Sequence, residues 1–205
     1  ASEAIADMPR RWREAIEGSG ELDLLGVRLL SEAHYLWSPG SLAGNLTSFF
    51  ASKAVRRRVD QVKGDQLPPA LQDPRFKGKV YRLSELVVDV PSLIERLAEL
   101  AGDGLLAGQN IEPVIENDEL IGLRIDGREI HAQRIIFSAG AGNAELLASA
   151  GISVPAQQLR PLHMVLVKGP SLKPLYAHCL GGGPKPRITV TTHPAANGEW
   201  VWYLG

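Results

Sequence analysis

The sequence contains very little cysteine, since Cys179 is the only one in 205 residues. A single thiol excludes an internal disulfide and a zinc site built from cysteine ligands. Such a composition suits a reducing compartment, and we predict a cytoplasmic location. We predict no metal-binding residues.

Long hydrophobic runs and an excess of charge of one sign are also missing. No stretch approaches the roughly 18 uninterrupted apolar residues of a membrane-spanning helix. The 22 lysines and arginines stand against 23 aspartates and glutamates, which leaves a formal net charge of -1. This balance suggests neither a polyanion partner nor an acidic, disordered chain.

The first 78 residues carry both helical and extended patterns. Apolar residues recur at the helical period over residues 1–18, and residues 26–38 are rich in strand formers. A second amphipathic helix is predicted over residues 41–59. Residues 64–78 contain several prolines and glycines, which predict a loop with one short helical turn.

A strand-to-helix unit and a run of short strands follow. We predict a strand that ends near Val90 and a helix that starts at Pro91, where proline is tolerated. Short extended segments are then predicted over residues 104–140, with Asn117-Asp118 and Asp126-Gly127 as turn signals. The alternation over residues 111–131 indicates an antiparallel meander between two elements of a parallel sheet.

The last third of the chain has a different character. Four extended segments lie within residues 157–205, separated by clusters of glycine and proline. They predict an antiparallel sheet. The change in pattern follows a helix predicted over residues 143–150.

A small-residue turn precedes that helix. The sequence "AGAG" at residues 139–142 follows an apolar run over residues 135–137, which predicts a buried strand, a turn and a helix. Main-chain amides at such a junction can meet an anion. The dinucleotide pattern G-x-G-x-x-G fails, however, because Glu145 occupies its last position. From the residues alone, a ligand contact and a tight packing turn both remain open.

Four segments, in their order along the chain, carry a resemblance to a known family. They are residues 86–101, the meander with "IEPV", residues 134–152 and residues 157–170. In this order they resemble the central part of the FAD-dependent oxidoreductases of the D-amino-acid oxidase and glycine oxidase type. The resemblance is strongest over residues 80–170 and weaker before Gly64.

The resemblance implies an α/β (α+β) fold. It combines a partial FAD-binding layer that carries a small antiparallel meander with an antiparallel-sheet substrate domain. Residues 1–78 would be the helical and strand part of the substrate domain, residues 79–155 the partial FAD-binding domain, and residues 156–205 the antiparallel substrate domain.

The resemblance also implies a cofactor and a reaction. The main chain at Val114 would contact the adenosine side of FAD. The turn at Ala139, Gly140 and Ala141 would lie against its pyrophosphate and ribityl region. The whole protein would oxidise an amine or amino-acid-like substrate by hydride transfer to flavin, which oxygen or another acceptor reoxidises.

The family's main dinucleotide clamp has no counterpart in the sequence. An N-terminal strand, a G-x-G-x-x-G turn and an acidic residue for the ribose are missing, as is the family's C-terminal segment. We therefore expect a central fragment of a longer protein. Most phosphate-binding amides would be lost, so the fragment should bind FAD weakly or not at all and be inactive alone.

The candidates for contact with substrate are weak. A guanidinium can pair with a substrate carboxylate, and histidine or tyrosine can line the pocket, although such residues are more often structural or surface residues. The candidates are Arg160, His163, Tyr176, His178 and Arg187.

Spacing separates some of these residues. Tyr176 and His178 lie two residues apart, so on a strand they share one face, and Cys179 points to the other. His163 alternates with apolar neighbours, which is typical of a hydrogen-bonded structural histidine.

Two other functions and one association remain alternatives. The missing fingerprint suits a non-catalytic interaction module. Some relatives of the family modify tRNA, and the basic run at residues 56–58 is the place to test RNA binding, although a solvated helix end explains this run better. A fragment with an uncovered sheet edge is also expected to self-associate as a homo-oligomer.

Overall fold

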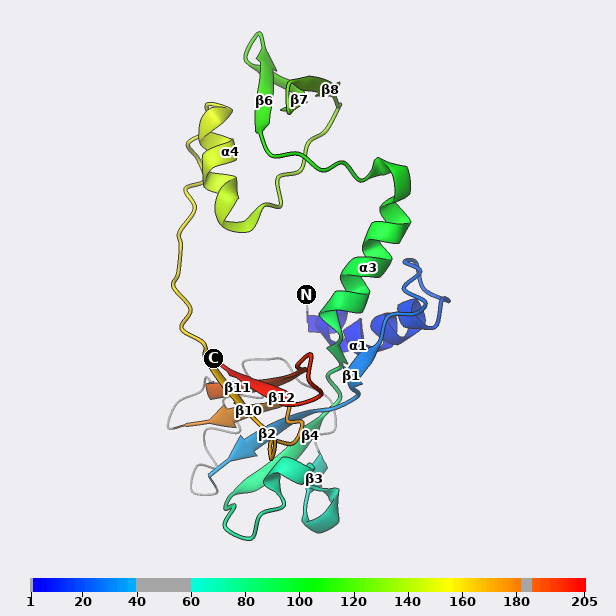
Figure 1. The fold of residues 1–205 in the computed structure, drawn as a ribbon, viewed down its shortest axis with the longest axis vertical. Coiled ribbons are helices and arrows are strands. Elements are labelled where there is room, and N and C mark those ends of the chain that lie inside the picture. Colours follow the sequence, from blue (N-terminus) through cyan, green and yellow to red (C-terminus); the bar gives the residue numbers. More distant parts are fainter. Residues whose placement is uncertain (1, 40–59, 182–185) are drawn as a thin grey trace. The chain divides into compact units, whose positions relative to one another are not determined.

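The computed structural model describes residues 2–39, 60–181 and 186–205. The chain divides into two compact units. The first contains Ala1–Leu100 and Leu162–Gly205, and the second contains Ala101–Pro161 (Figure 1). The predicted helix over residues 41–59, with the basic run at 56–58, lies outside the described residues.

A seven-stranded mixed sheet dominates the first unit. Its strands, in spatial order, are β3 (Asp60–Val62), β4 (Lys79–Leu83), β2 (His34–Ser38), β10 (Ala177–Leu180), β11 (Pro186–Pro194), β12 (Trp200–Leu204) and β9 (Val165–Gly169). All neighbours are antiparallel except β2 and β10, which are parallel. The sheet predicted for the end of the chain is therefore present, and strands from the first 83 residues extend it.

The two faces of this sheet pack differently, because successive side chains on a strand point to opposite faces. One face carries the larger core, which includes Val80, Ala177 and Val190 and packs against the loop after β3. That loop contains two short 3-10 turns, Gly64–Gln66 and Pro69–Leu71. The predicted loop with a helical turn is thus confirmed. The opposite face carries a smaller cluster of Leu36, Leu83 and Leu180.

A helix, a two-stranded ribbon and a second helix complete the first unit. They are α1 (Ser2–Ile16), β1 (Leu29–Ser31) paired with β5 (Val87–Val88), and α3 (Val90–Ala101). Ala15, Leu24 and Val27 form their buried cluster. The predicted strand before Pro91 is interrupted, because its last part leaves the large sheet to pair with β1.

The second unit contains the predicted meander. Its strands are β6 (Ile111–Glu116), β7 (Glu119–Ile125) and β8 (Arg128–His131), in the order β6-β7-β8. Asn117 and Asp118 turn the first hairpin with φ values of 49° and 64°. Asp126 and Gly127 turn the second with 46° and 85°. These left-handed conformations are the ones that favour asparagine, aspartate and glycine at hairpin turns. The helix α4 (Asn143–Ser149) follows, as predicted.

Three predictions for this unit are wrong. Residues 104–109 and 134–138 form no strand, and Ile136 is 89% exposed instead of buried. A strand requires a neighbouring strand for its main-chain hydrogen bonds, and within the described residues neither segment pairs with one. The expected parallel sheet around the meander is also not seen there, since the parallel pair among the described strands is β2 with β10.

Among the described residues, no helix combines the length and the apolar character required to cross a membrane.

Candidate functional site

The turn at residues 139–142 exposes its main chain. Ala139, Gly140 and Ala141 are all exposed. Gly140 has a φ of 58°, a left-handed conformation that glycine adopts without strain. A Cβ added at Gly140 would meet no atom within 4 Å. A ligand can therefore approach the peptide groups of this turn closely.

Not every amide of this turn is available to an anion. The Ala139 amide donates to Asn143 Oδ1 at 2.7 Å, and the Gly142 amide donates to the Ala139 carbonyl at 3.1 Å. Among the described residues, the amides of Gly140 and Ala141 donate to no main-chain carbonyl. The turn can thus offer two donors to a phosphate.

The helix that follows adds little electrostatic attraction. α4 has only 7 residues and carries Glu145 in its first turn. A short helix has a small dipole, and a carboxylate near its N-terminus opposes a second anion. These residues fit a secondary main-chain contact to a dinucleotide such as FAD and do not fit a complete phosphate clamp.

Val114 lies in the same unit as the turn. It pairs with Gly122 across β6 and β7, next to a shift in register, and its side chain is only 8% exposed. α4, which starts directly after the turn, contacts β6 (Figure 1). The helix that follows the turn is therefore packed against the strand of Val114, and the convergence of the turn and Val114 on one groove stays a prediction.

Two of the substrate candidates belong to the large sheet. Tyr176 is buried immediately before β10. Burial, and then the nearby Asp89 carboxylate, raise the pKa of its phenol, because both disfavour the phenolate. His178 lies within β10. Cys179 packs on the core of the opposite face, as the alternation predicts, and burial raises the pKa of its thiol.

The other three candidates lie on other segments, and all three residues are exposed. Arg160 and His163 are exposed in the irregular segment before β9, where Arg160 contacts Gln158 at 3.4 Å. Arg187 is exposed on β11, and its stem packs beside Gly181. Their contact with substrate stays a prediction.

Two residues that sequence reasoning missed lie beside His178. The rings of His34 and His178 have centroids 4.3 Å apart, and His178 Nε2 lies 3.8 Å from Glu85 Oε2. His34 begins a strand whose burial alternates, and it occupies one of the buried positions. A histidine at a buried strand position is a pattern from which sequence reasoning could have identified it. The pairing of β2 with β10, which joins the two histidines, has no signature in the local sequence.

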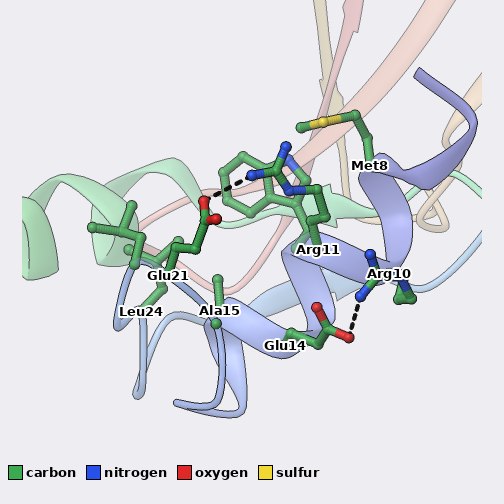
Figure 2. Close-up of a pocket in the computed structure, with 10 residues that line it drawn as sticks. Met8, Arg10, Arg11, Glu14, Ala15, Glu21 and Leu24 are labelled. Carbon is green, nitrogen blue, oxygen red and sulfur yellow. Dashed lines mark hydrogen bonds and ion pairs between the residues drawn. The ribbon is translucent and has the colours of Figure 1, made fainter. Parts of the chain in front are cut away.

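A surface pocket of about 470 Å³ lies elsewhere, between α1 and the loop that follows it. Figure 2 shows Arg10 and Arg11 at its wall, and each guanidinium is paired with a carboxylate. Arg10 pairs with Asp7 and Glu14, and Arg11 pairs with Glu21 at 2.9 Å. Since these charges are already compensated and no candidate residue lines the pocket, we assign it no role.

Comparison with known proteins gives one close relative. No protein-family model matches the chain. The chain is 72% identical over all its 205 residues to a curated Pseudomonas aeruginosa protein named probable FAD-dependent oxidoreductase PA4991, of which it covers 52%. The crystal structure of that FAD-dependent oxidoreductase aligns with all of this chain at a TM-score of 0.84 and 64% identity, over 51% of its own length. The chain thus spans about half the length of this relative.

More distant structures share the fold. L-proline dehydrogenase from P. horikoshii aligns with 97% of the chain at a TM-score of 0.65 and 12% identity, over 53% of its own length. Glycine oxidase from Geobacillus kaustophilus aligns with 98% at a TM-score of 0.56 and 17% identity, over 53% of its own length. The predicted resemblance is confirmed: this chain is a homologue of about half of an FAD-dependent oxidoreductase, with the fold of the matching half of glycine oxidase.

Proposed function

We propose that this chain is part of an FAD-dependent oxidoreductase that oxidises an amine or amino-acid-like substrate. The observation that carries the proposal is the 72% identity to half of a probable FAD-dependent oxidoreductase. The exposed turn at Gly140, packed through α4 against the strand of Val114, supports it. The cytoplasmic location stays a prediction.

The chain's own residues would hold and enclose the reactants. When bound, FAD supplies the acceptor for a hydride from the carbon beside the substrate amine. The amides of Gly140 and Ala141 would donate to the dinucleotide, and the main chain at Val114 would contact its adenosine side.

We expect the chain alone to retain little FAD and to be inactive. Two amide donors and a seven-residue helix are a small share of what a dinucleotide pyrophosphate needs. The test is to denature the purified chain and the full-length Pseudomonas aeruginosa relative and to measure the FAD that each releases. The expected result is about one FAD per full-length protein and almost none per chain.

The possible results separate the parts of this proposal. Stoichiometric FAD in the chain would show that its own residues are a sufficient site. An absence of flavin from both proteins would overturn the flavoenzyme proposal and favour an interaction module.

The substrate class has its own test. The similarly folded proteins are named for proline and glycine, which are small amino acids. We therefore expect amino acids or secondary amines to bleach the flavin of the full-length relative without oxygen. Bleaching by 2-hydroxy acids and not by any amine would contradict the proposed substrate class.

We also propose that the chain self-associates. β9 is an edge strand of the large sheet, and its Val165 and Leu166 are exposed. An apolar edge strand is a template for pairing with another copy. Light scattering over a range of concentrations should show a rising mass that Leu166→Lys reduces, and a constant monomer mass would refute this.

A further inference from the structure

We propose that His34, Glu85 and His178 form a binding site for a divalent transition-metal ion. Each residue offers one ligand atom, and these atoms all lie within 4.8 Å of one another. Two histidines and one carboxylate are a donor set found in zinc and non-haem iron sites. The proposal departs from the sequence-based prediction that no residue binds metal, and it does not depend on flavin.

Neighbouring strands of the large sheet position this cluster. β2 and β10 are parallel neighbours, with His178 opposite Leu36, and alternation places His34 on the same face. Leu83 of β4 pairs with His34, and Glu85 follows two residues later. Two ligands therefore come from adjacent strands and the third from the segment directly after a strand, as a precise metal site requires.

The distances are close to those of a metal site. Ligand atoms about 2.1 Å from a tetrahedral ion lie roughly 3.4 Å from one another. His178 Nε2 and Glu85 Oε2 are 3.8 Å apart, which is a few tenths of an ångström wider. The widest separation, within 4.8 Å, requires the ligand atoms to approach by up to about 1.4 Å. Rotation about the side-chain bonds of the ligands can bring them closer.

The other ring nitrogen of His178, Nδ1, has a hydrogen-bond partner that can orient the ring for metal binding through Nε2. His178 Nδ1 lies 3.0 Å from Thr189 Oγ1, on the neighbouring strand β11. When Nε2 binds an ion, Nδ1 carries the proton and donates it to the threonine hydroxyl. Such an outer partner fixes the tautomer and the ring direction of metal-binding histidines.

Burial of the cluster is graded. His34 is only 6% exposed, whereas the side chains of His178 and Glu85 are 16% and 42% exposed. Partial burial raises the effective strength of charge interactions at the histidines. The exposed side at Glu85 provides an entry path, and it leaves a position for water as a further ligand.

An ion pair between a protonated His178 and Glu85 is the competing explanation. The second unit offers a matched case, in which His131 Nε2 lies 3.7 Å from Glu129 Oε2 at the surface. Among the described residues, no second histidine joins this pair to make a group of three possible metal ligands. If both are simple His-Glu ion pairs, the two pairs should behave alike towards metal ions. A metal site predicts metal binding only at His34, Glu85 and His178.

The experiment is a titration of the chelator-treated 205-residue chain with Co²⁺ and Zn²⁺. We expect one equivalent of Co²⁺ to bind with a visible d-d absorption band that Zn²⁺ displaces. His178→Ala and Glu85→Ala should each weaken Zn²⁺ binding by more than about 100-fold, since loss of an outer partner alone costs about 10–100-fold. Thr189→Val should weaken it by about 10-fold.

His131→Ala is the control and should leave both binding and the absorption band unchanged. Circular dichroism of each variant verifies that the sheet remains folded, and the half-exposed Glu85 provides a variant that does not disturb the core. Absence of stoichiometric Co²⁺ binding, or binding that survives in both His178→Ala and Glu85→Ala, would overturn the proposal. Because the chain is tested without flavin, neither outcome bears on the proposed oxidoreductase function.

Discussion

His34 and His178 lie on neighbouring parallel strands, with their ring planes inclined by 41° and their centroids 4.3 Å apart. Their strands are distant in sequence and are joined by the single parallel pairing among the described strands. This pairing gathers polar side chains on the sheet face opposite the larger core. The same face is the one on which the proposed metal site lies.

Thr192→Val should destabilise the chain, because the threonine hydroxyl makes two buried hydrogen bonds to the main chain of Leu175. Thr192 is fully buried, and its Oγ1 accepts from the Leu175 amide and donates to the Leu175 carbonyl, both at 2.8 Å. Valine would leave the Leu175 amide and the Leu175 carbonyl buried without these hydrogen bonds. Each unsatisfied group lowers the free energy of unfolding by about 1–3 kcal/mol. Chemical denaturation should show the loss. Thr191→Val, on the other face, is the control, and an equal effect of both variants would contradict this role.

Asp89→Asn should weaken the start of α3 in a pH-dependent way. Asp89 accepts from Arg28 at 2.6 Å and from the Ser92 amide at 3.3 Å. Burial raises the pKa of this carboxyl, but the Ser92 hydrogen bonds and Arg28 outweigh it, so the pKa is lowered overall. A lowered pKa in the folded state means that this stabilisation is present above the unfolded value of about 3.9 and is lost as pH falls through the folded value.

Urea unfolding at neutral and acidic pH measures this effect. The free energy of unfolding should fall by about 1–3 kcal/mol at neutral pH. The difference between parent and variant should shrink below about pH 4. Asp73→Asn breaks an exposed pair with Arg75 and should change stability much less. A difference that is independent of pH would show that the Asp89 charge is not the cause.

Gly140→Ala should reduce FAD retention when it is introduced at the matching position of the full-length relative. The added Cβ would enter open space where the dinucleotide is proposed to lie. Gly151→Ala is a matched control, because Gly151 also has a positive φ, of 72°, with nothing within 4 Å of the added atom. Both variants should lose about 1 kcal/mol of stability from backbone strain. Loss of FAD from Gly140→Ala but not from Gly151→Ala would support the contact between the Gly140 turn and FAD. Equal FAD retention by the two variants would contradict that contact.

Ile136→Ser tests the correction of the predicted buried strand. At 89% exposure, Ile136 has little apolar contact to lose, so stability should change by less than about 0.5 kcal/mol. Val190→Ala, within the larger core, should instead cost about 2 kcal/mol or more. Thermal unfolding of the two variants measures the contrast. A large loss in Ile136→Ser would mean that this residue is buried.

Local patterns in the sequence were sufficient for much of the fold. The helical period gave α1, and Pro91 gave the start of α3 within one residue. Asn117-Asp118 and Asp126-Gly127 gave both turns of the meander. These features depend on side chains within a few positions of one another, so the sequence alone determines them. The family resemblance was likewise present in the order of segments along the chain.

Tertiary structure decided the rest, because pairing between distant strands depends on backbone partners that no local pattern encodes. Residues 134–138 have the composition of a buried strand and remain unpaired. The parallel pairing of β2 with β10 placed His34 beside His178, while the segment after β4 brought Glu85 to them. The sequence thus determined the elements and their family, and long-range pairing determined which side chains meet.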